Sequence, residues 1–324
     1  MSNLLRKSIK ILIPLILGIV ILFFLYRATN FRELWGYIKS ANWWVLSFSL
    51  IFGLMGNVCR GIRWNLLIKP LSYQPKTSHL VYAVLGSYAV NFAIPRAGEV
   101  WRCGMVSKQE KIPVQKLVGT IVIDRLFDVV MVGLFMLAAF VLNVKVFNKN
   151  HDLFNLPDWL RSPFLYIGLV VAGIICAVVL VAFKNYRIVQ RIRSFFADVW
   201  RDMVKVWHMK EKIRFLLYTF GIWISYFLYF YITFYAFDFT AHLGIAAGLF
   251  VFSMCSISLT IPSNGGLGPW QAAVVFGLGA YTVNIVQATA FATVVFAFQS
   301  IWLVSCGLFG IVMLSFGKDK KPVT

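Results

Sequence analysis

Two hydrophobic stretches of this chain are interrupted in the same way. Residues 91–102 read NFAIPRAGEVWR and residues 258–271 read SLTIPSNGGLGPWQ, so an Ile-Pro break recurs 167 positions along the chain. In lipid, irregular backbone is tolerated only where protein or water satisfies its polar groups. Matched interruptions in two halves of a membrane protein indicate a binding site where they meet. The two breaks therefore predict a transporter-like membrane protein.

The composition supports a membrane protein and excludes an ordinary soluble domain. The 324 residues are 60% hydrophobic and 13% charged, and residues 239–317 contain no Asp, Glu, Lys or Arg. That uncharged stretch is long enough for about three crossings at roughly 20 residues each. A soluble protein of this size could not bury it. We expect one polytopic membrane domain covering residues 1–324.

Uncharged runs predict an all-α integral membrane protein with six full transmembrane helices. The expected spans lie near residues 9–26, 43–59, 117–142, 163–183, 215–237 and 286–315. The two interrupted regions, 79–110 and 243–281, are each expected to form a re-entrant helical hairpin, and together an inverted repeat. In the alternative, the hairpins are full spans and the chain crosses the membrane about eight times or more.

The basic residues favour one orientation. With both termini cytoplasmic, 24 of the 31 Lys and Arg residues fall on cytoplasmic segments and 6 on external ones. This bias is the positive-inside pattern and predicts a multi-pass protein of the cell inner membrane. The first hairpin then enters from the cytoplasm and the second from outside. The net charge of +19 is expected to face anionic headgroups rather than nucleic acid.

Residues 184–214 differ from the rest of the chain. They carry nine Lys and Arg residues, and apolar side chains recur among them at roughly helical spacing. We expect a basic amphipathic helix on the cytoplasmic membrane surface, with a partner-binding helix as the alternative. The scattered cysteines and histidines show no metal-ligand spacing, so neither a metal nor another cofactor is expected.

Six charged residues close to the predicted spans are candidates for binding substrate. They form two clusters: Arg96, Glu99 and Arg102, which are expected to share one helix face, and Asp124, Arg125 and Asp128. Arginine suits phosphate because its planar fork donates two parallel hydrogen bonds. The alternative is that these charges form structural ion pairs between the first hairpin and its neighbouring span, including Arg125 with Asp128 at i,i+3.

The second break has no charged side chains, so any contact with an anionic substrate would come from its backbone N–H groups. Its glycines, Gly265, Gly266 and Gly268, precede a new helical run. Free N–H groups at a helix start attract anions, and glycine permits positive φ. Close packing between helices is the competing explanation. The predicted substrate-binding set also includes three amides, Asn91, Asn264 and Gln271.

Residues 95–102, 124–128 and 261–268 together resemble the flippase-like family of the lysylphosphatidylglycerol synthase transmembrane region. The resemblance covers most of the chain and implies a polytopic inner-membrane protein that moves lipids or lipid-linked intermediates between leaflets. Asn264 stands where the family usually has proline, and Gln271 where it often has glutamate, which argues against carrying over a lysyl-lipid specificity. The long synthases of the family also carry a soluble aminoacyl-transferase domain. Because the chain ends shortly after the last predicted span, we expect neither this domain nor an enzyme activity here.

The leading functional hypothesis is a flippase with a polar cavity between the two hairpins and an anionic phospholipid or lipid-linked intermediate as substrate. The sequence has no GxxxxGK[ST] phosphate loop, so transport is expected to be downhill or ion-coupled. Glu99, Asp124 and Asp128 are the candidate proton carriers. The alternatives are a membrane-embedded lipid transferase and a non-transporting partner of a lipid-modifying enzyme. Neither the lipid nor the oligomeric state follows from the sequence.

Overall fold

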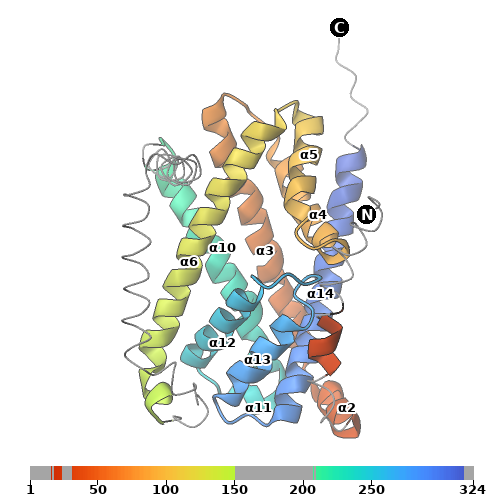
Figure 1. The fold of residues 1–324 in the computed structure, drawn as a ribbon, viewed down its shortest axis with the longest axis vertical. Coiled ribbons are helices and arrows are strands. Elements are labelled where there is room, and N and C mark those ends of the chain that lie inside the picture. The colour runs from red at the N-terminus through yellow and green to blue at the C-terminus, as the bar shows by residue number, and fades with distance from the viewer. Residues whose placement is uncertain (1–15, 17, 24–30, 150–206, 208, 317–324) are drawn as a thin grey trace, which may run out of the picture. The chain divides into compact units, whose positions relative to one another are not determined.

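The computed structural model describes residues 16, 18–23, 31–149, 207 and 209–316, and every regular element in them is helical (Figure 1). The chain divides into two compact units, Met1–Val144 with Ile213–Thr324, and Lys145–Lys212. The following description concerns the first unit. Its shorter elements are α2 (Phe31–Ser40), η1 (Lys69–Leu71), η2 (Ile232–Ala236) and α11 (Asp238–Ala241).

Four helices of the described residues are long and apolar enough to cross a membrane. They are α3 (Trp43–Ile68), α6 (Val114–Lys149), α10 (Lys212–Tyr231) and α14 (Ile285–Phe316). They correspond to four of the six predicted spans. Of the other two, the span predicted at 163–183 lies outside the described residues, as does most of the one at 9–26. Of the predicted amphipathic segment 184–214, residues 184–206 and 208 also lie outside them.

Helix α3 begins as the sequence predicts but ends later. The side chain of Asn42 caps it by accepting hydrogen bonds from the backbone N–H groups of Trp44 and Val45, at 3.1 and 3.3 Å. The predicted end at residue 59 is wrong, because Arg60 and Arg63 are buried within the helix rather than placed in a cytoplasmic loop. Removing these two from the cytoplasmic count leaves the predicted charge bias nearly unchanged.

Both interrupted regions form helical hairpins. The first pairs α4 (Thr77–Ala93) with α5 (Gly98–Glu110), and the second pairs α12 (Ile245–Ser258) with α13 (Pro269–Gly279). At 1.5 Å per residue these helices are about 16 to 25 Å long, shorter than the roughly 30 Å hydrocarbon core. Figure 1 shows the two hairpins towards opposite ends of the bundle, with their breaks facing its middle.

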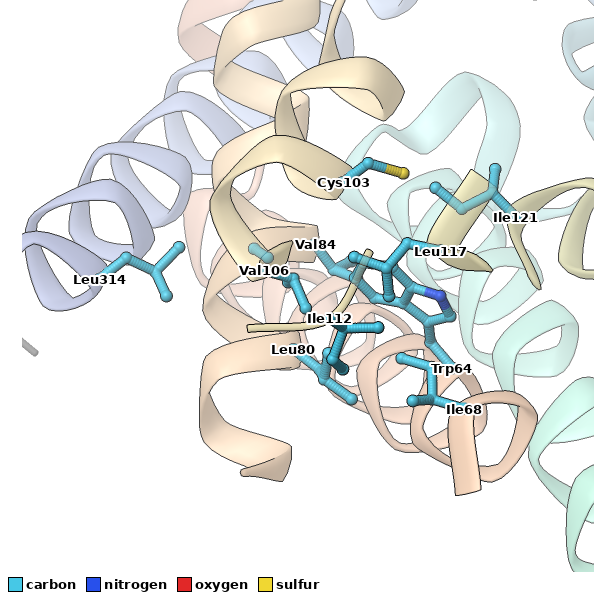
Figure 2. Packing of buried hydrophobic residues seen from close by; sticks show 11 residues of the cluster. Trp64, Ile68, Leu80, Val84, Cys103, Val106, Ile112, Leu117, Ile121 and Leu314 are labelled. Carbon is cyan, nitrogen blue, oxygen red and sulfur yellow. The ribbon is translucent and has the colours of Figure 1, made fainter. Parts of the chain in front are cut away.

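An apolar core holds the first hairpin against α3, α6 and α14 (Figure 2). Trp64 of α3 lies at its centre and donates a hydrogen bond from Nε1 to Thr120 Oγ1 of α6, at 2.8 Å. The indole can be buried because this bond satisfies its polar atom. The remaining members of the core are Ile68, Leu80, Ala83, Val84, Cys103, Val106, Ile112, Leu117, Ile121 and Leu314.

Aromatic side chains hold the second hairpin in the same way. Phe230 of α10 contacts Phe252 of α12 and Trp270 of α13, with ring centroids 6.2 and 6.1 Å apart. Phe291 of α14 lies 6.2 Å from Phe230 and 5.4 Å from Phe234. The Phe230–Phe252 pair is tilted and the other three are edge-to-face, and such pairs add to the stabilisation from burying large apolar rings. Each hairpin is therefore anchored to the long helices by its own core.

Candidate functional site

The two breaks, residues 94–97 and 259–268, lie against each other. Arg96 Nη2 donates a hydrogen bond to the carbonyl oxygen of Thr260 at 2.7 Å. Asn264 Nδ2 donates one to the carbonyl oxygen of Phe92, in the last turn of α4, at 3.1 Å. Each hairpin thus lends a side-chain donor to a backbone carbonyl of the other. The contact between the two breaks, expected from their similar sequences, is present in the structure.

The backbone of the first break explains why Arg96 reaches across. Arg96 has φ 62°, in the left-handed region that only a few non-glycine residues adopt. Helix α5 does not begin until Gly98, so Arg96 precedes it. The expectation that Arg96 shares one helix face with Glu99 and Arg102 is therefore wrong. Only Glu99 and Arg102 lie on α5, and Arg96 contacts the second hairpin instead.

The glycines of the second break have the expected positive φ, between 61° and 92° at Gly265, Gly266 and Gly268. Two of the N–H groups at the start of α13, however, are already bonded within the chain. The N–H of Gly268 donates to Gln271 Oε1 at 2.7 Å, and the N–H of Trp270 donates to Gly266 O at 3.0 Å. These two groups are therefore not free for an anion, and anion binding at the other N–H groups of this break stays a prediction.

Two of the predicted substrate-binding amides hold the backbone of the breaks. Gln271, 3% exposed, caps the start of α13 through its bond with Gly268. Asn91 Oδ1 accepts a hydrogen bond from the N–H of Gly98 at 2.8 Å, joining the end of α4 to the start of α5. Both side chains satisfy backbone groups that a break in a helix leaves unpaired. Asn264 is the amide that reaches the opposite hairpin.

Four buried charges link α3 to α6. Arg60 Nη1 lies 2.7 Å from Asp128 Oδ2 and 3.4 Å from Asp124 Oδ2. Arg63 Nη2 lies 2.6 Å from Asp124 Oδ1 and 2.8 Å from Asp128 Oδ1. All four side chains are at most 8% exposed. Each arginine therefore contacts both aspartates in an environment where an unpaired charge would be costly.

Helix α5 adds two more ion pairs to this group. Glu99 pairs with Arg125 at the half-exposed edge, and Arg102 Nη2 lies 3.6 Å from Asp124 Oδ2. Arg125 Nη1 is 3.6 Å from Asp128 Oδ2, which confirms the predicted i,i+3 pair. We call the seven residues the charge cluster: Arg60, Arg63, Glu99, Arg102, Asp124, Arg125 and Asp128. It ties the first hairpin to α3 and α6, as the ion-pair alternative expected.

Helix α10 completes the polar surroundings of the charge cluster. Trp223 Nε1 donates to Asp128 Oδ1 at 3.4 Å, and Arg60 Nε donates to the Tyr226 hydroxyl at 3.2 Å. That hydroxyl donates to Asn57 Oδ1 at 2.8 Å and lies 3.0 Å from the hydroxyl of Tyr88 on α4. The network therefore joins three long helices to both helices of the first hairpin.

The sequence reasoning missed Arg60, Arg63 and Tyr226. A signal for the arginines was present, because the apolar run resumes after Arg63 with Trp64 and residues 66–68. Their i,i+3 spacing also places both on one side of a helix. Tyr226 had no comparable signal. Within the part of the chain that the structure describes, no group of His, Cys, Asp and Glu is arranged to hold a metal ion.

The comparison with protein families connects this geometry to known proteins. The model of the lysylphosphatidylglycerol synthase transmembrane region matches residues 11–307, which include both breaks and the whole charge cluster. The chain belongs to this family. Membership confirms the resemblance drawn from the motifs and indicates a multi-pass membrane protein related to lipid modification or transport. Neither a curated protein nor a solved structure matches the chain significantly.

Proposed function

We propose that this protein is a flippase-type transporter that moves a lipid or lipid-linked headgroup between leaflets. The headgroup passes through a polar cavity between two re-entrant hairpins, while the acyl chains stay in lipid. The observation that carries the proposal is the reciprocal contact of the breaks, Arg96 with Thr260 and Asn264 with Phe92. Transporters of several folds place their substrate sites where two such discontinuous segments meet.

The lengths of the hairpin helices support a re-entrant arrangement. None of the four reaches the roughly 20 residues needed for a full crossing. A pair that enters from each side and stops near the middle brings both breaks to one depth. With four long helices and the two further spans predicted near 9–26 and 163–183, this gives six full spans plus two hairpins. The bias of the basic residues supports an orientation with both termini in the cytoplasm, and we propose the inner membrane as the location.

The charge cluster favours downhill transport over proton coupling through Asp124 or Asp128. Each aspartate pairs with both Arg60 and Arg63 in a buried setting. Neutralising one of them would remove a partner from two buried arginines, which costs several kcal/mol (about 3–5). A residue that carries protons repeatedly would have to avoid that cost. We therefore propose downhill transport. Because the sequence has no GxxxxGK[ST] phosphate loop, we also propose that the protein uses no ATP directly and is not itself an enzyme.

Transbilayer movement in vesicles that contain only this protein tests the proposal. A fluorescent phospholipid in both leaflets is bleached from outside with dithionite, which does not cross the bilayer. With transport, nearly all of the label becomes accessible within minutes, whereas about half stays protected in vesicles holding an unrelated multi-pass protein. If the two preparations bleach equally for every anionic phospholipid tested, the flippase proposal is wrong and a non-transporting membrane partner becomes the better interpretation.

A further inference from the structure

Arg102 differs from the other arginines of the charge cluster because no carboxylate of the described residues lies within hydrogen-bonding distance of it. Its side chain is 2% exposed, yet nothing among the described residues accepts a hydrogen bond from its Nε or Nη2. Arg63 Nε also lacks an acceptor among the described residues, but Arg60 and Arg63 each have a carboxylate oxygen within 2.8 Å. Arg125 pairs with Glu99. Arg102 therefore holds two buried donors that the described part of the chain leaves without acceptors.

The nearest carboxylate cannot serve Arg102 fully. Asp124 Oδ2 lies 3.6 Å from Arg102 Nη2, beyond hydrogen-bonding distance, because Asp124 also contacts Arg60 and Arg63. The guanidinium carbon of Arg102 lies 4.9 Å from the centroid of the Trp64 ring, which stabilises the charge but accepts no bond in the guanidinium plane. Buried donors without acceptors are costly, more so when they are charged. The site is therefore incomplete as it stands.

The charge balance of the cluster specifies what would complete it. Four arginines face three carboxylates, so the cluster has one positive charge in excess. Gln271, in the second hairpin, is uncharged, and its Oε1 accepts a hydrogen bond from the N–H of Gly268. No carboxylate from the second break corrects the imbalance. A ligand that neutralises the cluster must bring one negative charge and acceptor oxygens.

We propose that Arg102 binds the phosphate of a headgroup with one net negative charge, such as an anionic phosphodiester lipid. This inference rests on the proposed function and names the charge class of its substrate. The planar guanidinium offers parallel donors to two phosphate oxygens. Glu99, one turn of α5 from Arg102, is 35% exposed, and its partner Arg125 on α6 is 48% exposed, so this pair marks the side from which the headgroup would approach. A cationic aminoacyl lipid would instead add to the excess positive charge.

Binding of short-chain lipids to the purified protein in neutral micelles tests this assignment without a transport step. Four probes are compared: phosphatidylglycerol with one net negative charge, phosphatidylcholine with none, lysylphosphatidylglycerol with one net positive charge, and inorganic phosphate. The variants are Arg102→Gln and, as the matched control, Lys108→Gln, which removes the same charge from an exposed position on the same helix. Gel filtration and thermal unfolding report whether each variant folds.

The wild-type protein should bind phosphatidylglycerol at least about tenfold more tightly than phosphatidylcholine, and lysylphosphatidylglycerol most weakly. Loss of a hydrogen-bonded charge should weaken phosphatidylglycerol binding in Arg102→Gln roughly tenfold to a hundredfold, with Lys108→Gln within about twofold of wild type. Should Arg102→Gln fail to fold, the headgroup series on the wild type decides alone.

Equal affinity for the three lipids would overturn the assignment, as would a folded Arg102→Gln variant with wild-type affinity. Inorganic phosphate that binds as tightly as phosphatidylglycerol would also overturn it, because the site would then take a free anion rather than a headgroup. The two proposals, flippase activity and phosphate binding by Arg102, can be refuted independently of each other. Charge-selective binding without transbilayer movement refutes the flippase alone, whereas movement without charge selectivity refutes the role of Arg102 alone.

Discussion

Replacing Gly98 with alanine should loosen the first hairpin. Gly98 begins α5, and a Cβ there would overlap the carbonyl oxygen of Ser87 and lie 2.8 Å from Asn91 Cγ. The carbonyl belongs to the backbone of α4, so no side-chain rotation relieves the overlap. Helices α4 and α5 would have to separate, and the hydrogen bond from Gly98 to Asn91 would lengthen.

The expected loss of stability follows from these contacts. Overpacking a tight site costs about 1–3 kcal/mol, and a weakened hydrogen bond adds about 0.5–1.5 kcal/mol. The helical preference of alanine over glycine offsets up to about 1 kcal/mol. We expect a net destabilisation of about 2 kcal/mol, which is a shift of roughly 30-fold in the unfolding equilibrium. The altered tip should also lose the contact from Arg96 to Thr260.

Unfolding in mixed micelles, followed by tryptophan fluorescence, measures this difference. Gly104→Ala is the matched control, because Gly104 lies in the same helix and a Cβ added there would have no neighbouring atom within 4 Å. That variant should be as stable as the wild type or up to about 1 kcal/mol more stable. The reasoning is refuted if Gly98→Ala is no less stable than wild type, or if the two variants lose the same amount.

Three further predictions concern the charges and the topology. Asp128→Asn should lower the free energy of unfolding by about 3–5 kcal/mol because it unpairs buried arginines, whereas the exposed Asp238→Asn should change it by less than about 1 kcal/mol; equal effects in micelle unfolding would contradict the buried network. In a cysteine-free background, Ala97→Cys and Leu267→Cys should react with impermeant thiol reagents from opposite sides, and labelling of both from one side only excludes the inverted arrangement. External protease should leave residues 184–214 intact in whole cells, since cleavage there would reverse the proposed orientation.

The main features of the described fold could be predicted from hydropathy and chain breaks. Uncharged runs locate α10 and α14 within three residues of each predicted end, if the short η2 is counted with α10. The two Ile-Pro breaks locate both hairpins and their mutual contact. These features depend on local sequence, because lipid permits few backbone conformations. A hydropathy pattern does not show when a buried charge is neutralised by a residue far away in the sequence.

The misplaced end of α3 shows where local reasoning fails. Arg60 and Arg63 resemble loop charges because hydropathy counts them as exposed. They are buried only because Asp124 and Asp128, more than 60 residues away, neutralise them. Likewise, the roles of Asn91 and Gln271 depend on which backbone N–H each break leaves unpaired. The sequence therefore predicted which residues belong to the candidate site, apart from Arg60, Arg63 and Tyr226, but not which residues form ion pairs or hydrogen bonds with one another.

The crossed contact of the breaks has a consequence for how the hairpins could move. In the proposed re-entrant arrangement, the carbonyl oxygens of Phe92 and Thr260 lie at the depth of the hydrocarbon core. Each accepts a hydrogen bond from the opposite hairpin, Phe92 O from Asn264 and Thr260 O from Arg96. If the hairpins part, both carbonyls need new donors, and lipid tails supply none. Separation of the hairpins therefore requires water or a headgroup to enter the gap and donate these hydrogen bonds. We expect the gap to open and to fill with water at the same time.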